Sequence, residues 1–173
     1  GVVTVKSAPG KGSVFTILIP ALTASAQEIE EKKPVPAEWI GKGTILVVDD
    51  EEAVSTVTCS LLESYGFNIW RASDGVQGVE LFRAHSAEID VVLLDYIMPR
   101  MNGEEAFNEI KRLRKDVSVF LMSGYGEQEA VERFAGKGLT GFIQKPFKSN
   151  ELREKMRDHF HPPAMVRQQG LLF

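Results

Sequence analysis

The sequence predicts an α/β protein: a doubly wound, five-stranded parallel sheet flanked by five helices, with an N-terminal β-hairpin. Two patterns predict the sheet: short apolar runs recur five times between residues 44 and 144, and a segment with helical spacing follows each run. Such alternation implies right-handed crossovers and helices on both faces. A third pattern, alternating residues on either side of the turn Pro9-Gly10-Lys11-Gly12, predicts the hairpin.

The five apolar runs set the expected strands of the sheet. The first and third runs, TILVVD and DVVLLD, are the most apolar, which is typical of strands covered on both faces. The strands are expected at residues 44–49, 67–72, 90–95, 117–122 and 141–144.

Each strand is followed by a segment that predicts a helix. The first helix is expected over Glu51–Tyr65, with a core face formed by Val54, Val57, Leu61 and Tyr65. The second follows the turn Ser73-Asp74-Gly75, which offers a helix cap, and buries Val76, Val79 and Phe82. The other three are expected through 106–113, near 128–134 and over 149–159.

Length and composition bound the domain organisation. The chain has 173 residues, which suffices for one packed domain with appendages. Residues 21–43 are rich in Ala, Glu, Lys and Pro and lack an apolar period, so they are expected to form a linker. The expected organisation is a hairpin at 1–20, the linker at 21–43, the domain at 44–160 and a flexible tail at 161–173.

Charge and cysteine content limit the partners and the compartment. The net charge is −4 without a basic block, which argues against nucleic-acid binding. A single cysteine, Cys59, excludes an internal disulfide and suits the cytoplasm. No apolar run approaches membrane-spanning length. The chain starts at Gly1 without methionine, so we expect a fragment whose parent protein could carry a membrane anchor elsewhere.

Polar side chains are expected at the carboxyl ends of four predicted strands. In a doubly wound sheet these ends meet at one edge, which is where ligands bind. The residues there are Asp49 with Asp50, Asp95, Ser123 and Lys145. Singly, each has an ordinary explanation as a helix cap, a turn residue or a solvated charge. Their joint occurrence at four strand ends favours a site.

The chemistry of these groups points to phosphoryl transfer. Carboxylates forced together repel unless a cation neutralises them, and their oxygens suit Mg²⁺. A lysine and a hydroxyl can hold phosphoryl oxygens. Asp95 is the best nucleophile, since the adjacent Asp49 and Asp50 are better placed as metal ligands.

Four segments resemble the signatures of response-regulator receiver domains. They are ILVVDDE (45–51), VVLLDYIMPRMNG (91–103), LMSGYGE (121–127) and GFIQKPF (141–147), in the family's order and at its spacing. The resemblance covers about residues 44–160. It implies a flavodoxin-like sheet with strand order 2-1-3-4-5 and a role as phosphoacceptor in a two-component phosphorelay.

The resemblance also implies ligands for a metal ion, Mg²⁺ or alternatively Mn²⁺. Asp50 would bind the ion directly, and Asp49 directly or through water. Asp95 and the backbone carbonyl of Ile97 would complete the protein ligands. Asp95 would accept phosphate from a phosphohistidine of its own kinase, of a partner kinase or of a histidine phosphotransfer protein.

The remaining signature residues are implied in phosphoryl binding and switching. Ser123 and Lys145 would hold the phosphoryl oxygens, and the Lys145–Pro146 peptide bond is commonly cis in the family. Ser123 and the aromatic Phe142 would form the switch that changes the face made by the fourth helix, fifth strand and fifth helix.

Two other functions stay open for this site. A phosphohydrolase with an aspartate nucleophile usually carries a second Asp two residues later, where this chain has Ile97. A receiver-like docking module that is never phosphorylated typically loses an acidic ligand or the lysine, and neither is lost here.

The hairpin resembles the last hairpin of the ATP-binding domain of sensor histidine kinases. A kinase end, a linker and a receiver follow the order of a hybrid histidine kinase. This chain has no acceptor-histidine helix and no ATP lid, so we expect it to catalyse only its own phosphorylation. The hairpin, without its domain, is expected either to fray or to pair with a second copy of the chain as a homodimer.

Overall fold

The computed structural model describes residues 1–19, 39–124, 134 and 136–162. The chain divides into two compact units, Gly1–Glu38 and Trp39–Phe173. Within the described residues, none of the helices combines the length and the apolar character that crossing a membrane requires.

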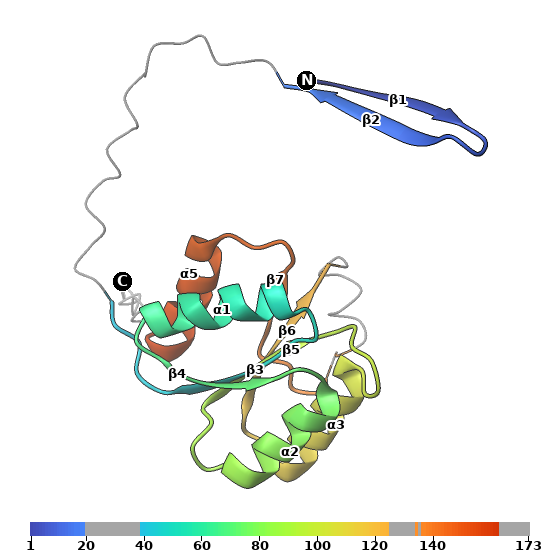
Figure 1. Cartoon of the computed structure of the whole chain (residues 1–173). Helices are drawn as coiled ribbons and strands as arrows, with labels where there is room; N and C mark the ends of the chain where they lie inside the picture. The colour runs from blue at the N-terminus through green and yellow to red at the C-terminus, as the bar shows by residue number, and fades with distance from the viewer. Residues whose placement is uncertain (20–38, 125–133, 135, 163–173) are drawn as a thin grey trace, which may run out of the picture. The chain divides into compact units, whose positions relative to one another are not determined.

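The first unit contains the predicted hairpin (Figure 1). Strands β1 (Val2–Ala8) and β2 (Gly12–Leu18) pair antiparallel, and the turn between them uses Gly10 and Gly12 at φ 72° and 78°. A side chain is disfavoured at such positive φ values, so glycine suits both positions. All residues of both strands are exposed.

The second unit is built on a five-stranded parallel sheet (Figure 1). Its strands are β3 (Thr44–Val48), β4 (Asn68–Ala72), β5 (Val91–Asp95), β6 (Ser118–Ser123) and β7 (Gly141–Gln144). The spatial order is β4-β3-β5-β6-β7, which confirms the predicted order 2-1-3-4-5. The most apolar strands, β3 and β5, lie at the centre and are almost wholly buried, as their composition predicts.

Helices cover both faces of this sheet. Helices α1 (Glu52–Ser64) and α5 (Ser149–Phe160) pack on one face, and α2 (Gly75–His85) and α3 (Gly103–Leu113) on the other (Figure 1). The described residues contain four helices, where five were predicted. The missing one, expected at 128–134, falls outside the described residues except for Phe134, which is helical and buried.

The predicted core face of α1 is wrong in part. Val57 is 58% exposed, and the buried row consists of Ser55, Thr58, Cys59 and Leu62. Two of these are polar, but the Ser55 hydroxyl accepts a hydrogen bond from Arg71 Nε (2.8 Å) and the Thr58 hydroxyl donates to the Val54 carbonyl (2.8 Å). Because their hydroxyls are satisfied, these residues can be buried at little cost.

Trp39 is the first residue of the second unit and packs against aromatic residues of that unit. Its ring lies 5.6 Å from that of Phe67, which in turn lies 4.9 Å from the ring of Phe160 at the end of α5. Trp39 Nε1 donates a hydrogen bond to Nδ1 of His161 (3.0 Å). The segment entering β3 is therefore anchored to the end of α5.

Candidate functional site

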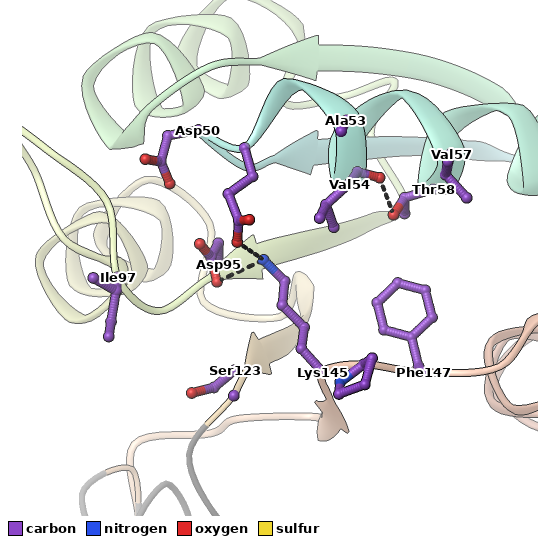
Figure 2. A pocket seen from close by; sticks show the side chains of 13 residues that line it. Asp50, Ala53, Val54, Val57, Thr58, Asp95, Ile97, Ser123, Lys145 and Phe147 are labelled. Carbon is purple, nitrogen blue, oxygen red and sulfur yellow. Dashed lines mark hydrogen bonds and ion pairs between the residues drawn. The ribbon is translucent and has the colours of Figure 1, made fainter. Parts of the chain in front are cut away.

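The carboxyl ends of β3, β5, β6 and β7 converge on one pocket of about 830 Å³ (Figure 2). Parallel strands place their carboxyl ends along the same edge, so residues distant in sequence become neighbours there. Thirteen residues line the pocket: Asp50, Glu51, Ala53, Val54, Val57, Thr58, Asp95, Ile97, Ser123, Gly124, Lys145, Pro146 and Phe147.

Lys145 lies at the centre of the charged part of this pocket. Its Nζ is 2.8 Å from Asp49 Oδ2. It is also 3.1 Å from Asp95 Oδ1 and 3.7 Å from a Glu51 oxygen (Figure 2). The side chains of Lys145, Asp49 and Asp95 are only 12%, 0% and 7% exposed. Buried charges of this kind persist only when they are paired, and here one ammonium serves two carboxylates.

Backbone contacts fix the position of Lys145. Its amide donates to the carbonyl of Ser123 (2.7 Å), which ties the end of β7 to the end of β6. The Lys145–Pro146 peptide bond is cis, as the resemblance implied. Ser123 itself is 3% exposed and lines the pocket beside Lys145.

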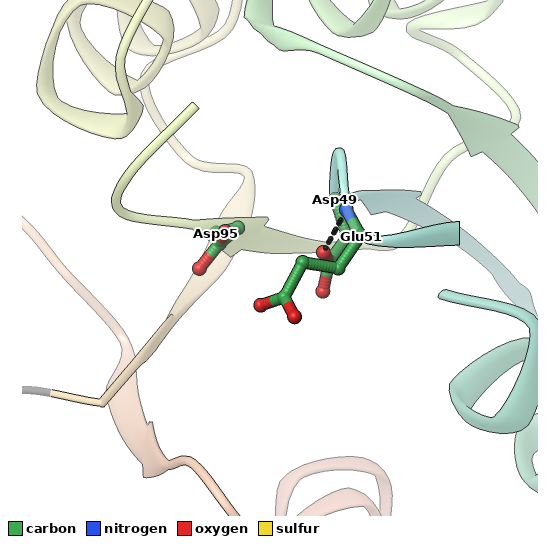
Figure 3. A group of neighbouring side chains, drawn as sticks. All are labelled: Asp49, Glu51 and Asp95. Carbon is green, nitrogen blue, oxygen red and sulfur yellow. Dashed lines mark hydrogen bonds between the residues drawn. The ribbon is translucent and has the colours of Figure 1, made fainter. Parts of the chain in front are cut away.

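Three carboxylates gather around Lys145. Asp49, Glu51 and Asp95 each offer an oxygen, and these three oxygens lie within 4.8 Å of one another (Figure 3). The Glu51 amide donates to Asp49 Oδ1 (3.0 Å), which orients the Asp49 carboxylate. Asp49 Oδ2 is buried and has the Lys145 ammonium as its ion-pair partner. An oxygen-rich cluster of this kind suits a hard divalent cation such as Mg²⁺.

The electrostatics of Asp95 follow from its burial. Burial raises the pKa of its carboxyl to about 6, and the Asp49 charge acts in the same direction. The Lys145 ammonium and the Tyr96 amide, which donates to Asp95 Oδ1 (2.9 Å), oppose this shift without cancelling it. A cation bound nearby would therefore stabilise the ionised form of the Asp95 carboxyl.

Burial has the opposite effect on the pKa of Lys145, because the charged form of lysine is the protonated one. Burial by itself lowers the pKa of its ammonium. The hydrogen bond to Asp49 and the charges of Asp95 and Asp49 outweigh burial, so the pKa of Lys145 is raised. The lysine therefore stays charged at neutral pH and is available to an incoming anion.

The other predicted site residues take different positions. Asp50 is exposed and lines the pocket, but its carboxylate lies apart from the Lys145 contacts in Figure 2. Ile97 is 57% exposed and lines the same pocket. Phe142 on β7 is 4% exposed and packs in the core between the sheet and helices α2 and α3, outside the pocket lining.

Two parts of the site were missed by sequence reasoning. Glu51, which the sequence predicts only as the first residue of a helix, joins the carboxylate cluster. The acidic run Asp49-Asp50-Glu51 contains the signal for this. An apolar wall also lines the pocket, formed by Ala53, Val54 and Val57 of α1 together with Phe147. Assigning Val57 to the core concealed this wall.

Comparison with known proteins decides the family. A family model described as "Response regulator receiver domain" matches residues 45–157, which is more than half of the chain. The chain belongs to this family. It is thus a receiver domain of two-component phosphorelay signalling, and its acidic pocket lies at the carboxyl edge of the sheet.

Individual relatives agree with this family. The chain is 28% identical over 165 residues to Sensor kinase CckA of Brucella abortus (strain 2308), covering 91% of this chain and 18% of that kinase. It is 34% identical over 113 residues to Chemotaxis protein CheY of Treponema pallidum (strain Nichols), and this match covers 65% of this chain and 78% of that protein. The chain thus spans less than a fifth of the kinase relative.

Solved structures share the fold of the receiver. A chain in the crystal structure of the CheX–CheY–BeF3–Mg+2 complex from Borrelia burgdorferi is 30% identical and superposes with a TM-score of 0.65. The superposition covers 68% of this chain and 89% of that one.

Proposed function

We propose that Asp95 accepts a phosphoryl group in a Mg²⁺-dependent reaction. The observation that carries the proposal is the buried Lys145 ammonium, within 3.1 Å of both Asp95 Oδ1 and Asp49 Oδ2. In the reaction a carboxylate oxygen of Asp95 attacks phosphorus, the bond from phosphorus to the donor nitrogen breaks, and the imidazole leaves. The product is an aspartyl phosphate.

The pocket supplies the groups that this reaction needs. We assign the metal to Asp49, Asp50, Asp95 and the Ile97 carbonyl, with Mn²⁺ as the second ion to compare. When bound, the ion neutralises charge that builds up on the phosphoryl oxygens. The similar structure from Borrelia burgdorferi is described as a complex with BeF3 and Mg+2, which supports the choice of Mg²⁺ as the ion.

Ser123 and Lys145 would hold the phosphoryl oxygens. Both line the pocket, and Lys145 already carries its charge next to Asp95. A transferred phosphoryl adds negative charge beside Ser123. We propose that Phe142, which is buried, moves as Ser123 engages this group. This movement would change the face formed by β7, α5 and the fourth helix expected near residues 128–134, a helix that lies outside the described residues except for Phe134.

The donor is proposed to be a phosphohistidine, from the chain's own kinase, a partner kinase or a histidine phosphotransfer protein. The match to a sensor kinase over 91% of this chain, well beyond residues 45–157, supports a hybrid histidine kinase as the parent. In that parent, residues 1–20 would be the end of the ATP-binding domain, and residues 21–43 would link this domain to the receiver. The receiver would span residues 44–160, and residues 161–173 would form a flexible tail. We place the receiver in the cytoplasm of the cell.

Incubation with Mg²⁺ and acetyl phosphate tests the proposal. Intact mass spectrometry should show one added phosphoryl group on the wild type and none on Asp95→Asn. Asp116→Asn is the matched control, because Asp116 is an exposed carboxyl before β6, at the opposite edge of the sheet. EDTA should abolish the adduct in the wild type.

The outcomes separate the three functions. An Asp95-dependent adduct formed only with divalent metal supports the receiver. No adduct under any condition would show a docking module instead. Repeated turnover of a phosphoester, without a stable adduct, would show an aspartate-based phosphohydrolase.

A further inference from the structure

The loop between β5 and α3 carries Ile97 from the strand end to the pocket. It spans residues 96–102 and starts directly after Asp95. Ile97 lines the pocket, so the path of this short loop sets where the Ile97 carbonyl lies. The loop also contains Arg100, which meets Asp74, a residue outside the loop; the proposed function uses neither of these two charged residues.

Asp74 is a fixed point outside the pocket. It caps α2, and its Oδ1 accepts a hydrogen bond from the Gln77 amide (3.0 Å). The side chain is only 3% exposed, and its second oxygen, Oδ2, forms an ion pair with Arg100 Nη2. The cap holds the carboxylate in one orientation, so Oδ2 is presented to Arg100 without further ordering of Asp74.

Arg100 holds an uncommon backbone conformation. Its φ is 67°, the only positive φ of a non-glycine residue in the described segments. The left-handed region costs an L-residue about 1–2 kcal/mol, so such a residue persists where its surroundings specify it. Glycine would adopt this φ more readily, but glycine could not reach Asp74. The side chain at this position therefore serves a contact.

Neighbouring contacts tie the rest of the loop to the same place. A Cβ added at Gly75 would lie 2.5 Å from the Met101 carbonyl oxygen, so the first turn of α2 abuts the loop. The Met101 amide donates to the Pro99 carbonyl (2.8 Å), and the Gly103 amide donates to the Tyr96 carbonyl (2.9 Å). The loop is thus closed on itself and fastened to α2 at Arg100 and Met101.

We propose that the Asp74–Arg100 ion pair is a positioning device for the metal site. It fastens the loop to the cap of α2 and thereby holds the backbone at Ile97 in place for Mg²⁺. The inference rests on the proposed function, in which the Ile97 carbonyl is a metal ligand. The Arg100 side chain is 64% exposed, so water weakens its attraction to Asp74 and the pair is expected to add little to stability. The effect is therefore expected on metal affinity instead of on folding.

Two single variants test the pair from each side. Asp74→Asn keeps a good cap for α2 and removes the charge, and Arg100→Gln removes the guanidinium. We expect the Mg²⁺ dissociation constant, measured by calorimetry with the metal alone, to rise on the order of tenfold in both. Arg100→Lys should recover part of the affinity, since it keeps the charge but loses the planar fork.

Kinetics and the double variant separate positioning from a general defect. Phosphorylation by acetyl phosphate should be slower at low Mg²⁺ and return to within about twofold of wild type at saturating Mg²⁺. Asp74→Asn combined with Arg100→Gln should bind Mg²⁺ no more weakly than either single variant, because one interaction is lost in all three.

A readout in the metal-free protein isolates the loop itself. Amide hydrogen exchange at Met101 and Gly103 should be faster in Asp74→Asn and Arg100→Gln than in wild type. The amide of Ala106, in the first turns of α3, should exchange as before. Arg112→Gln is the matched control, because Arg112 forms an exposed ion pair with Glu109 (2.6 Å) on α3, away from the pocket lining.

The results distinguish this inference from the proposed function. Unchanged Mg²⁺ affinity in both variants, or the same change in Arg112→Gln, would overturn the positioning role while the wild type still binds Mg²⁺ and is phosphorylated. Wild-type protein that neither binds Mg²⁺ nor forms an adduct would overturn the proposed function instead. Equal losses at low and saturating Mg²⁺ would also contradict positioning.

Discussion

A single buried lysine organises the charges of the pocket. Lys145 pairs with Asp49 and Asp95, and all three are largely shielded from water. One ammonium cannot fully compensate two carboxylates in such a place, and the raised pKa of Asp95 expresses the remaining repulsion and desolvation. The free protein therefore carries an electrostatic cost at the residues that we assign to metal binding and phosphoryl transfer.

Asp95→Asn is predicted to stabilise the metal-free protein near neutral pH. Folding raises the Asp95 pKa from 3.8 to about 6, so between these values the folded state binds more protons than the unfolded state. The free energy of unfolding therefore falls as the pH rises through this window. In EDTA at about pH 7.5 the variant should gain about 1–3 kcal/mol, and the gain should vanish near pH 4.

Urea unfolding at both pH values measures this difference. Asp116→Asn is the control, because it removes an exposed carboxyl that lies just before β6, at the opposite edge of the sheet from the pocket. If Asp95→Asn raised the free energy of unfolding equally at the two pH values, the folded-state pKa of Asp95 would not lie above its unfolded value.

Helix α1 shows how packing decides which face of an element is buried. Its apolar spacing favoured a face containing Val57, but Leu62, Cys59 and the satisfied hydroxyls of Ser55 and Thr58 form the buried row. Turning the helix this way leaves Val57 to line the pocket. An element of the core thereby also supplies one wall of the site.

Substitutions on the two faces of α1 should differ sharply in stability. Leu62 is fully buried, so Leu62→Ala should lower the free energy of unfolding by about 2–5 kcal/mol. Val57→Ala, at an exposed position with a better helix former, should change it by less than about 0.5 kcal/mol. Chemical denaturation of both variants checks the assignment, and a large loss in Val57→Ala would restore the face expected from the sequence.

The whole chain consists of two units with separate structural bases. Both hydrophobic core clusters contain only residues from Trp39 onward, and the hairpin strands are exposed throughout. The receiver therefore has its own core. Trp39 extends this core beyond the predicted start at residue 44, through its contact with Phe67 and its hydrogen bond to His161.

Removal of residues 1–38 is predicted to leave the melting temperature of the receiver nearly unchanged. In contrast, Trp39→Ala should cost about 1 kcal/mol through the lost aromatic contact and lower the melting temperature by roughly 4 °C. Differential scanning calorimetry of the truncated protein, the variant and the full chain tests both statements. A marked loss on truncation would mean that the first unit contributes to receiver stability.

Much of the fold could be predicted because local patterns specified it. Five apolar runs separated by helical segments determined the strands, and parallel pairing then determined the edge where Asp49, Asp95, Ser123 and Lys145 meet. These residues were predicted as a group because strand ends are recognisable in a sequence. Their assignment to catalysis stays a proposal.

The sequence by itself thus determined the architecture and the chemistry available at the sheet edge. Only the tertiary structure decided that Glu51 joins Asp49 and Asp95, that Val57 faces the pocket, and that Asp74 meets Arg100. Local periodicity reports which residues can share a strand or a helix face. Contacts between separate elements depend on how those elements rotate and pack against each other, and no local pattern contains that information.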